Sequence, residues 1–435
     1  MSATAVNQSL KVSSFTAKSE TKKLFWMIML LFALIIGRAY NNSFFYVFAA
    51  ISLIIFIIAD NTYCIPLLFF LLPFSTLLKL NSNTISFFTV LFFLTVLKMA
   101  LAQKKLGANF ISALFAIFIY CLLQSGLSQI TTIVTMVAGF LMLYCMRSME
   151  VDANTVVVSY SVGIFLASVL AECRSFLPIV RSFVQYSILK FGENSYVFRF
   201  AGLQGNPNYY TMDIIMVLAA IVVLIRIKQS SFLQICCFVA LSAFGIMSVS
   251  KSFLISWVIL ILCWLFLSVK HRISNVLRLI FILAITAMAI YYFAYDYVNS
   301  YLLRFMDDSI GTASSFTTGR TVIWKAYIET IFSNSKILWF GNGLNTIASN
   351  MIKGTHNTFL ECLFSLGIFG TVLYIIALKN SMGKIITKKI VWVPILMLLI
   401  RMLAIGILTY DNIYFYFAII LMVAKACQVS EENIV

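Results

Sequence analysis

Apolar runs follow one another along most of this chain, separated by short polar gaps. A helix needs about 20 apolar residues to cross the hydrocarbon core of a membrane. On that measure the runs predict about fourteen membrane spans, with a range of 12–14. They lie at roughly 24–40, 44–59, 62–80, 84–102, 109–127, 130–146, 154–173, 209–226, 232–249, 252–269, 276–295, 357–378, 390–409 and 412–428. The pattern therefore predicts an all-α polytopic integral membrane protein.

Composition excludes a soluble globular protein. Hydrophobic residues make up 62% of the chain and charged residues 11%, with a mean hydropathy of +0.99, whereas soluble domains carry about 25% charged residues. The net charge of +16 does not indicate nucleic-acid binding, because the Lys and Arg residues fall mostly in the short gaps, where they set orientation. The nine Cys lie mainly in apolar runs without a C-x2-C pair, so neither a disulfide nor a metal site is expected.

The distribution of basic residues predicts the topology. Residues 1–23 are polar and basic and are expected to form a disordered cytoplasmic tail, and 429–435 a second one. A single transmembrane domain fills 24–428, and no A-x-A cleavage signal closes its first run, which favours a span over a cleaved signal peptide. If the N-terminus is cytoplasmic and successive gaps between spans alternate between the two sides of the membrane, six of the cytoplasmic gaps carry positive charge, as the positive-inside rule requires. Two long loops, 174–208 and 296–356, then lie outside, and the second is expected to contain short helices.

The first outer loop carries Arg199, which opens the run RFAGLQGNPNYY before a span. Long loops cross the membrane regardless of charge, so its basic residues are either solvated or the docking site of an anionic group. Gly202 and Gly205 allow backbone N–H groups to approach a phosphate closely. Asn208 is the expected N-cap of the following helix.

Three further cations lie near or inside spans. Lys251, in SVSKSFL, stands at a predicted outer mouth, where it either snorkels to the interface or binds a ligand. Arg38, near the outer end of the first span, is expected to be an interfacial anchor. Arg401 lies in the middle of LMLLIRMLAIG, where a charge costs several kcal/mol unless it faces a polar interior. It is either functional or paired with a carboxylate, for which the candidates are Asp213, Glu172 and Asp411.

The second outer loop contains TVIWKAYIETIF, whose apolar positions have helical spacing. Ile323, Tyr327 and Ile331 predict a short amphipathic helix. Arg320 falls in its first turn, one turn before Trp324. Gly319 and the FGNG run at 340–343 indicate a compact loop whose backbone is accessible.

His356 precedes an expected helix start. Thr358 and Glu361 have the spacing of a capping box, in which each side chain satisfies a free N–H group. His356 would stand just outside that helix end, either as a structural hydrogen bonder or as a general base at neutral pH. His271, the other histidine, lies in a basic KHR run and is expected to be solvated at the cytoplasmic interface.

These candidates suggest one kind of substrate. Arg199, Lys251, Arg320 and His356 are all predicted on the outer face, without an H-E-x2-H motif or a carboxylate cluster. Cations of this kind suit a diphosphate leaving group, whose developing charge they stabilise, while the histidine takes a proton from an attacking hydroxyl. A lipid-linked diphosphate sugar is the simplest match, and no metal or cofactor is expected.

Several motifs together resemble the O-antigen polymerase and O-antigen ligase superfamily. They are RFAGLQGNPN before a span, SVSKSFL at a mid-chain junction, and GR-x3-W, FGNG and HN-x2-LE with G-x2-G around the second outer loop. The resemblance implies a metal-independent glycosyltransferase that uses an undecaprenyl-diphosphate-linked oligosaccharide, without a cofactor, at the periplasmic face of the bacterial inner membrane. It implies that His356 activates the acceptor and that Arg199 and Arg320 hold the diphosphate. His356 and Arg320 would then be the catalytic residues. Lys251, a further candidate for binding the diphosphate, stands where the family often has Arg. The residues expected to support the site are Asn357, Glu361, Trp324 and Arg401.

The forms RFAGLQGNPN and SKSFL favour a polymerase of O-antigen or capsule-like polysaccharide, with a chain-length regulator as a possible partner. The alternative within the family is a ligase that transfers polymer to lipid A-core in lipopolysaccharide biosynthesis. A third hypothesis is a flippase for the same lipid-linked sugars. Transporters of that class have internal repeats and midplane sites, and no repeat is visible in this sequence.

Overall fold

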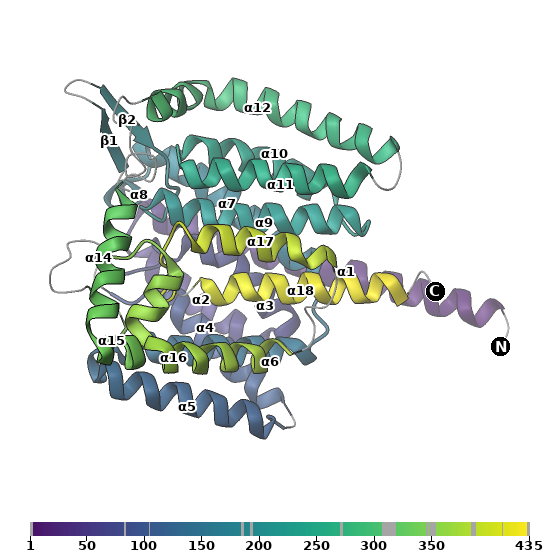
Figure 1. The fold of residues 1–435 in the computed structure, drawn as a ribbon. Coiled ribbons are helices and arrows are strands. Elements are labelled where there is room, and N and C mark those ends of the chain that lie inside the picture. The colour runs from purple at the N-terminus through teal and green to yellow at the C-terminus, as the bar shows by residue number, and fades with distance from the viewer. Residues whose placement is uncertain are drawn as a thin grey trace.

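The chain folds into a bundle of helices in a computed structural model that describes residues 3–81, 84–103, 105–183, 187–191, 195–269, 273–306, 319–344, 347, 354–383, 389–410 and 412–432. The helices are α1 (Ala3–Tyr40), α2 (Phe44–Ile58), α3 (Asn61–Leu71), α4 (Phe87–Ala102), α5 (Ala108–Ser125), α6 (Ile130–Ser148), α7 (Ala153–Glu172), α8 (Pro178–Phe183), α9 (Pro207–Arg226), α10 (Phe232–Met247), α11 (Lys251–Val269), α12 (Ile273–Met306), α14 (Arg320–Ser333), α15 (Ser335–Phe340), α16 (Thr358–Met382), α17 (Trp392–Met402) and α18 (Ile413–Glu432). Most long helices run side by side, while α8, α14, α15 and a small hairpin lie at one end of the bundle (Figure 1).

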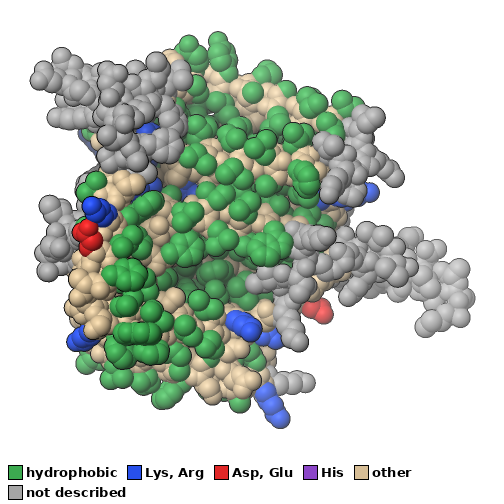
Figure 2. All heavy atoms as spheres, in the orientation of Figure 1, with side chains coloured by type: hydrophobic (Ala, Val, Ile, Leu, Met, Phe, Trp, Pro, Cys, Tyr) green, Lys and Arg blue, Asp and Glu red, His purple; other side chains and the backbone are tan. Residues whose placement is uncertain are grey.

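Among the described residues, eight helices are long and apolar enough to cross a membrane. Six shorter apolar helices accompany them: Phe44–Ile58, Asn61–Phe74, Phe87–Ala102, Phe232–Met247, Trp392–Met402 and Ile413–Gln428. Apolar side chains cover the middle of the visible surface, whereas Lys and Arg side chains gather toward its two ends (Figure 2). The prediction of an all-α membrane protein is confirmed at this level. The number of helices that cross the membrane stays a prediction.

α9 is the centre of the bundle. Nearly every residue between Tyr210 and Ile225 is buried, and the helix packs against α7, α10, α11, α17 and α18. A helix that is apolar on all sides belongs in the interior of a large protein. Its first turn therefore brings polar residues to a fixed place at the end of the bundle that carries α14.

Two predicted spans have different lengths in the structure. α12 extends to Met306 with a kink at Ala294 (φ −129°), close to the predicted end at 295, and beyond the kink its packed face continues through Tyr297 and the buried Tyr301. α17 ends at Met402, although the apolar run extends to 409. The segment 403–410 leaves the helix and lies against the start of α16, where Thr358 Oγ1 donates to the Ile405 carbonyl at 2.6 Å.

A β-hairpin, which the sequence analysis did not predict, lies within the loop 174–208. β1 (Ser187–Phe191) pairs antiparallel with β2 (Ser195–Arg199), and Ser187 lies opposite Arg199. The second strand contains Tyr196, Val197 and Phe198, residue types that favour extended structure. The hairpin fixes the direction from which Arg199 approaches the helices. The segment 1–23, assigned to a tail, falls mostly within α1.

Candidate functional site

α14 is the short helix that the sequence predicted around Ile323, Tyr327 and Ile331, and it lies across the end of the bundle (Figure 1). Tyr327 and Ile331 are fully buried against Phe364 of α16, and the rings of Tyr327 and Phe364 meet edge to face at 4.9 Å. Trp324 Nε1 donates to the carbonyl of Thr355 at 3.0 Å. These contacts hold the first turn of α14 beside the segment that leads into α16.

The FGNG run closes against a break in α16. Gly367 interrupts the helix with φ 64°, which leaves carbonyl groups before it without helical partners. Asn342 N–H donates to the Phe364 carbonyl at 2.8 Å, and Gly343 N–H donates to the Ser365 carbonyl at 3.0 Å. A Cβ on Gly341 would lie 2.3 Å from Ser365 O, so only glycine fits. The FG-x-G and G-x2-G motifs thus form one structural unit.

The helix start after His356 differs from the predicted capping box. Asn357 is the N-cap, and its Oδ1 accepts from the N–H groups of Phe359 at 3.0 Å and Leu360 at 3.2 Å. The prediction that Thr358 and Glu361 cap the helix is wrong, because both side chains are engaged with the segment after α17. Asn357 therefore fixes the start of α16 directly after His356.

Glu361 binds the irregular segment that follows α17. Its carboxylate accepts from the Leu408 N–H at 3.0 Å and from Thr409 Oγ1 at 3.4 Å. Because α17 ends at Met402, the backbone groups of this segment lack helical partners and need side chains instead. Gly406 passes so close that a Cβ there would lie 2.8 Å from Glu361 Oε2. Glu361 is therefore a residue that positions the segment 405–409.

His356 is half-buried and has a left-handed backbone conformation, with φ 48°. Such a φ is uncommon for a residue with a side chain and costs of order 1–3 kcal/mol unless the surroundings enforce it. Its neighbours supply that constraint, since Thr355 is held by Trp324 and Asn357 caps α16. The histidine is thereby fixed at the end of the bundle, next to α14.

Arg401 is fully buried, and its partners are uncharged. It donates to Ser252 Oγ at 2.6 Å, to the Asn208 carbonyl at 2.6 Å and to Thr211 Oγ1 at 2.8 Å. Its Nε is buried without a hydrogen-bond partner. Of the two alternatives left open for Arg401, pairing with a carboxylate does not hold for Asp213 or Glu172, and Asp411 lies outside the described residues. Asp213 accepts instead from Tyr416, Asn412 and Gln204.

Arg199 reaches the same group of residues from the end of β2. It is buried, with Nε 3.1 Å from the Ser248 carbonyl and one terminal nitrogen 3.4 Å from Asn208 Oδ1. Asn208 was predicted as the N-cap of α9, but Asn206 has that position and accepts from the Asn208 N–H at 2.9 Å. The side chain of Asn208 is therefore available to bind Arg199, while its carbonyl binds Arg401.

Lys251 is the first residue of α11 and is half-buried. The turn before it is held from two sides: Ser250 Oγ donates to Asn208 Oδ1 at 3.0 Å, and Tyr301 of α12 donates to the Ser250 carbonyl at 3.2 Å. Because Ser252 binds Arg401, Lys251 lies between two residues that contact the arginine cluster. The structure thus brings Arg199, Lys251 and Arg401 together.

Arg320 joins this cluster from α14. It follows Gly319, whose φ of 79° allows the chain to turn into the helix. Burial lowers the pKa of the Arg320 guanidinium from its usual value. Its charge also acts on Arg401, so the two guanidinium groups lie within electrostatic range of each other. Within the part of the chain that the structure describes, no hydrogen bond or ion pair is formed by Arg320.

Arg38 has a structural role and is not the interfacial anchor that was predicted. It is fully buried and donates to the carbonyls of Leu77 at 3.3 Å and Lys79 at 2.7 Å, and also to Asn42 Oδ1. The chain between α3 and α4 leaves those carbonyls without helical partners, so the arginine satisfies them. This contact shapes the turn that carries Ser75, Thr76 and Lys79.

The described residues contain no group of three His, Cys, Asp or Glu side chains placed to hold a metal ion. The residues that the sequence analysis missed are neutral: Asn208, Ser250, Ser252 and Thr211 bind the cations, and Tyr301 supports them. The only signal of the first four in the sequence is the crowding of polar residues at two helix starts, in NPNYYT and SVSKS.

Comparison with known proteins returned no match to a family model, to a curated protein or to a solved structure.

Proposed function

We propose that this chain is a polymerase that joins undecaprenyl-diphosphate-linked oligosaccharide repeat units at the outer face of a bacterial cytoplasmic membrane. One observation carries the proposal: Arg320 and Arg401 lie within electrostatic range of each other at the end of the bundle, and neither has a carboxylate partner among the described residues. Like charges repel each other, and the repulsion is stronger in a buried site than in water. An anion bound between them removes that repulsion.

A diphosphate suits this cluster better than a single carboxylate. Arg199 and Lys251 add two further cations, and both are tied to Arg401 through Asn208 and the serines of the 248–252 turn. Arginine presents paired donors that match phosphate oxygens, and such charge-assisted hydrogen bonds are about twice as strong as neutral ones. The unpartnered Nε of Arg401 offers one more donor.

An apolar cavity beside the cluster suits the lipid part of such a substrate. It lies between α7, α10 and α12, has a volume of about 960 Å³, and is lined mainly by hydrophobic side chains. Phe244 and Met247 belong to its wall, and Phe200, which follows Arg199, stacks on Phe244 with ring centroids 5.6 Å apart. A polyprenyl chain in this cavity would carry its diphosphate toward Arg199.

The reaction then follows from these positions. His356 takes the proton from a hydroxyl group of the acceptor saccharide, and the hydroxyl oxygen forms a bond to the anomeric carbon of the donor. The bond between that carbon and the diphosphate oxygen breaks, and the diphosphate leaves with the electron pair. Arg320, Arg401 and Arg199 stabilise the negative charge that develops on the leaving group.

We further propose that the chain crosses the membrane about fourteen times, which puts both chain ends in the cytoplasm and the loops 174–208 and 296–356 in the periplasm. Membrane lipid surrounds the bundle, and a polysaccharide chain-length regulator is a candidate partner. The basic inner gaps support this orientation.

Polymer formation in proteoliposomes tests the proposal. With synthetic lipid-linked repeat units as the only substrate, the wild type should make a ladder of longer products, and Arg320→Ala and Arg401→Gln should each lower the rate at least 100-fold. Arg181→Ala is the matched control, because Arg181 is exposed on α8 at the same end of the bundle. A ladder made equally well by Arg320→Ala would refute the proposed site. Product only after addition of lipid A-core would indicate a ligase, and transbilayer movement without bond formation a flippase.

A further inference from the structure

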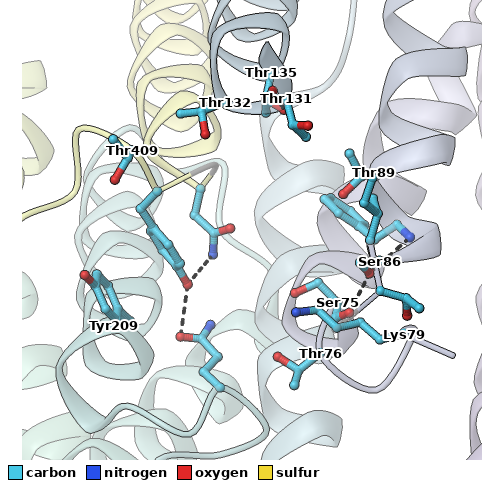
Figure 3. Close-up of a pocket in the computed structure, with 16 residues that line it drawn as sticks. Ser75, Thr76, Lys79, Ser86, Thr89, Thr131, Thr132, Thr135, Tyr209 and Thr409 are labelled. Carbon is cyan, nitrogen blue, oxygen red and sulfur yellow. Dashed lines mark hydrogen bonds between the residues drawn. The ribbon is translucent and has the colours of Figure 1, made fainter. Parts of the chain in front are cut away.

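A second cavity, lined largely by hydroxyl groups, lies beside the cationic cluster. It has a volume of about 400 Å³ and is formed by five separate segments: the turn after α3, the residues around the start of α4, the start of α6, the segment 204–209 that leads into α9, and the loop between α17 and α18. Its hydroxyl-bearing residues are Ser75, Thr76, Thr84, Ser86, Thr89, Thr131, Thr132, Thr135, Tyr209, Thr409 and Tyr410. The threonines of α6 face those of the α3–α4 turn and α4 across the opening (Figure 3).

Several of these hydroxyl groups are available to a ligand. Those of Thr76, Thr89 and Thr131 form no hydrogen bond with any described residue, in contrast to Ser86, which donates to the Ser75 carbonyl at 2.5 Å. Each threonine hydroxyl offers one donor and two acceptor sites. Among the described residues that line the cavity, Lys79 is the single charged one.

The rear of the cavity is held rigid by a buried network. Tyr410 donates to Gln204 Oε1 at 3.2 Å and accepts from Asn412 Nδ2 at 3.0 Å, as the dashed lines in Figure 3 show. Gln204 and Asn412 both donate to the buried carboxylate of Asp213. Polar groups held in this way are pre-organised, so little ordering entropy is lost when a ligand binds.

An aromatic surface completes the wall. The rings of Tyr209 and Tyr410 are stacked, with centroids 4.5 Å apart, and Tyr209 also donates to the Gly406 carbonyl at 2.9 Å. A sugar ring presents hydroxyl groups around its edge and C–H groups on its faces. A cavity that combines free hydroxyls, amides and tyrosine rings matches both kinds of surface.

The cavity shares two of its segments with the proposed reaction site. Asn208, which binds Arg199 and Arg401, is followed directly by Tyr209, which lines the cavity. Thr409 lines the cavity while its hydroxyl donates to Glu361, five residues after His356. A molecule in the cavity is thereby placed next to the diphosphate cluster and not over it.

We propose that this hydroxyl-lined cavity binds a saccharide unit of the substrate, a subsite that rests on the proposed function and adds the recognition of sugar hydroxyls to it. The cationic cluster holds the diphosphate, and the cavity selects the glycan.

The test compares binding of sugar and of diphosphate by the full-length protein in nanodiscs. The sugar probe is the oligosaccharide released by mild acid from lipid-linked material that accumulates in cells with the Arg320→Ala protein; the diphosphate probe is inorganic pyrophosphate. Thr89→Val with Thr131→Val removes two free hydroxyl groups. Thr95→Val is the matched control on α4, because its hydroxyl donates to the Leu91 carbonyl at 2.8 Å away from the cavity.

The double variant should bind the oligosaccharide at least about tenfold more weakly in equilibrium dialysis, since each lost hydrogen bond is worth several-fold in affinity. It should bind pyrophosphate as the wild type does, and Thr95→Val should bind both probes normally. Unchanged oligosaccharide affinity in the double variant, or no oligosaccharide binding by the wild type, would overturn the subsite. Loss of pyrophosphate binding in Arg401→Gln with sugar binding intact would show that the two parts are separate. Failure of the wild type to bind pyrophosphate would count against the proposed function instead.

Discussion

Arg401 of α17 donates a hydrogen bond to the backbone carbonyl of Asn208 in the first turn of α9, at 2.6 Å. The Asn208 side chain accepts at the same time from Arg199 and from Ser250. One neutral residue therefore sets the separation of two arginines that come from segments far apart in the chain. The arrangement is built around uncharged oxygen atoms, and this leaves the positive charges available to an anion.

The geometry of the arginines should matter as much as their charge. Lys keeps the charge of Arg but lacks its paired donors, so Arg320→Lys and Arg199→Lys should lose most polymerisation activity. Lys251→Arg should keep it, because Arg supplies the same charge at that position. Rates of polymer formation at equal protein levels provide the measurement. Full activity of Lys251→Ala would show that Lys251 only anchors α11 at the membrane interface.

Pyrophosphate should stabilise the protein by binding the arginine cluster. A ligand present at about 100 times its Kd adds roughly 2.7 kcal/mol to the free energy of unfolding, which should appear as a rise of several degrees in the Tm of the purified protein. Arg401→Gln should lose this rise, whereas Arg181→Gln should show it in full. An equal rise in the Arg401→Gln protein would place the anion elsewhere.

Glu361 should contribute to stability through the segment that it binds. Glu361→Ala leaves the buried Leu408 N–H without its acceptor, which costs about 1–3 kcal/mol, so the Tm should fall. Glu361→Gln should recover most of that loss, because its amide oxygen can accept from Leu408. Thermal unfolding of the three proteins in the same detergent makes the comparison. If Glu361→Ala unfolds at the wild-type temperature, the hydrogen bond between Glu361 and Leu408 does not contribute to stability.

The sequence predicted those elements whose pattern is local. The apolar runs located the helices, and the spacing of Ile323, Tyr327 and Ile331 identified α14 and its buried face. The apolar run after Arg401 predicted the end of the span wrongly. LAIGILTY is apolar enough to continue the helix, but the segment leaves α17 and binds Thr358 and Glu361. Hydropathy alone does not distinguish these two outcomes.

Contacts between distant segments account for the rest. The sequence left open whether Arg401 is functional or paired with a carboxylate. Its partners Asn208, Thr211 and Ser252 lie about 150–190 residues away and are too common in type to be recognised as ligands. The capping of α16 by Asn357 was missed because Thr358 and Glu361 also fit the spacing of a capping box. The hydroxyl-lined cavity is assembled from five segments, and none of them carries a motif.

The topology predicts which residues a membrane-impermeant thiol reagent can reach. In a Cys-free background, a cysteine at Ser333 on α14 should react in intact cells or spheroplasts, and one at Lys105, between α4 and α5, should react only after the membrane is opened. Both positions are exposed, so the difference would report sidedness and not burial. Labelling with the opposite pattern would remove the basis for a periplasmic site.

His356 is either a general base or a residue that only supports the start of α16, and one measurement decides between these roles. The most direct measurement is the single-turnover rate of glycosidic bond formation from synthetic lipid-linked repeat units in proteoliposomes, for the wild type, His356→Ala and His356→Gln. The account predicts that both variants insert normally and still bind the donor but react roughly 10²–10⁴-fold more slowly, the usual contribution of general base catalysis. Gln keeps hydrogen-bonding capacity without a titratable proton, so near wild-type turnover by His356→Gln would contradict the proposed mechanism.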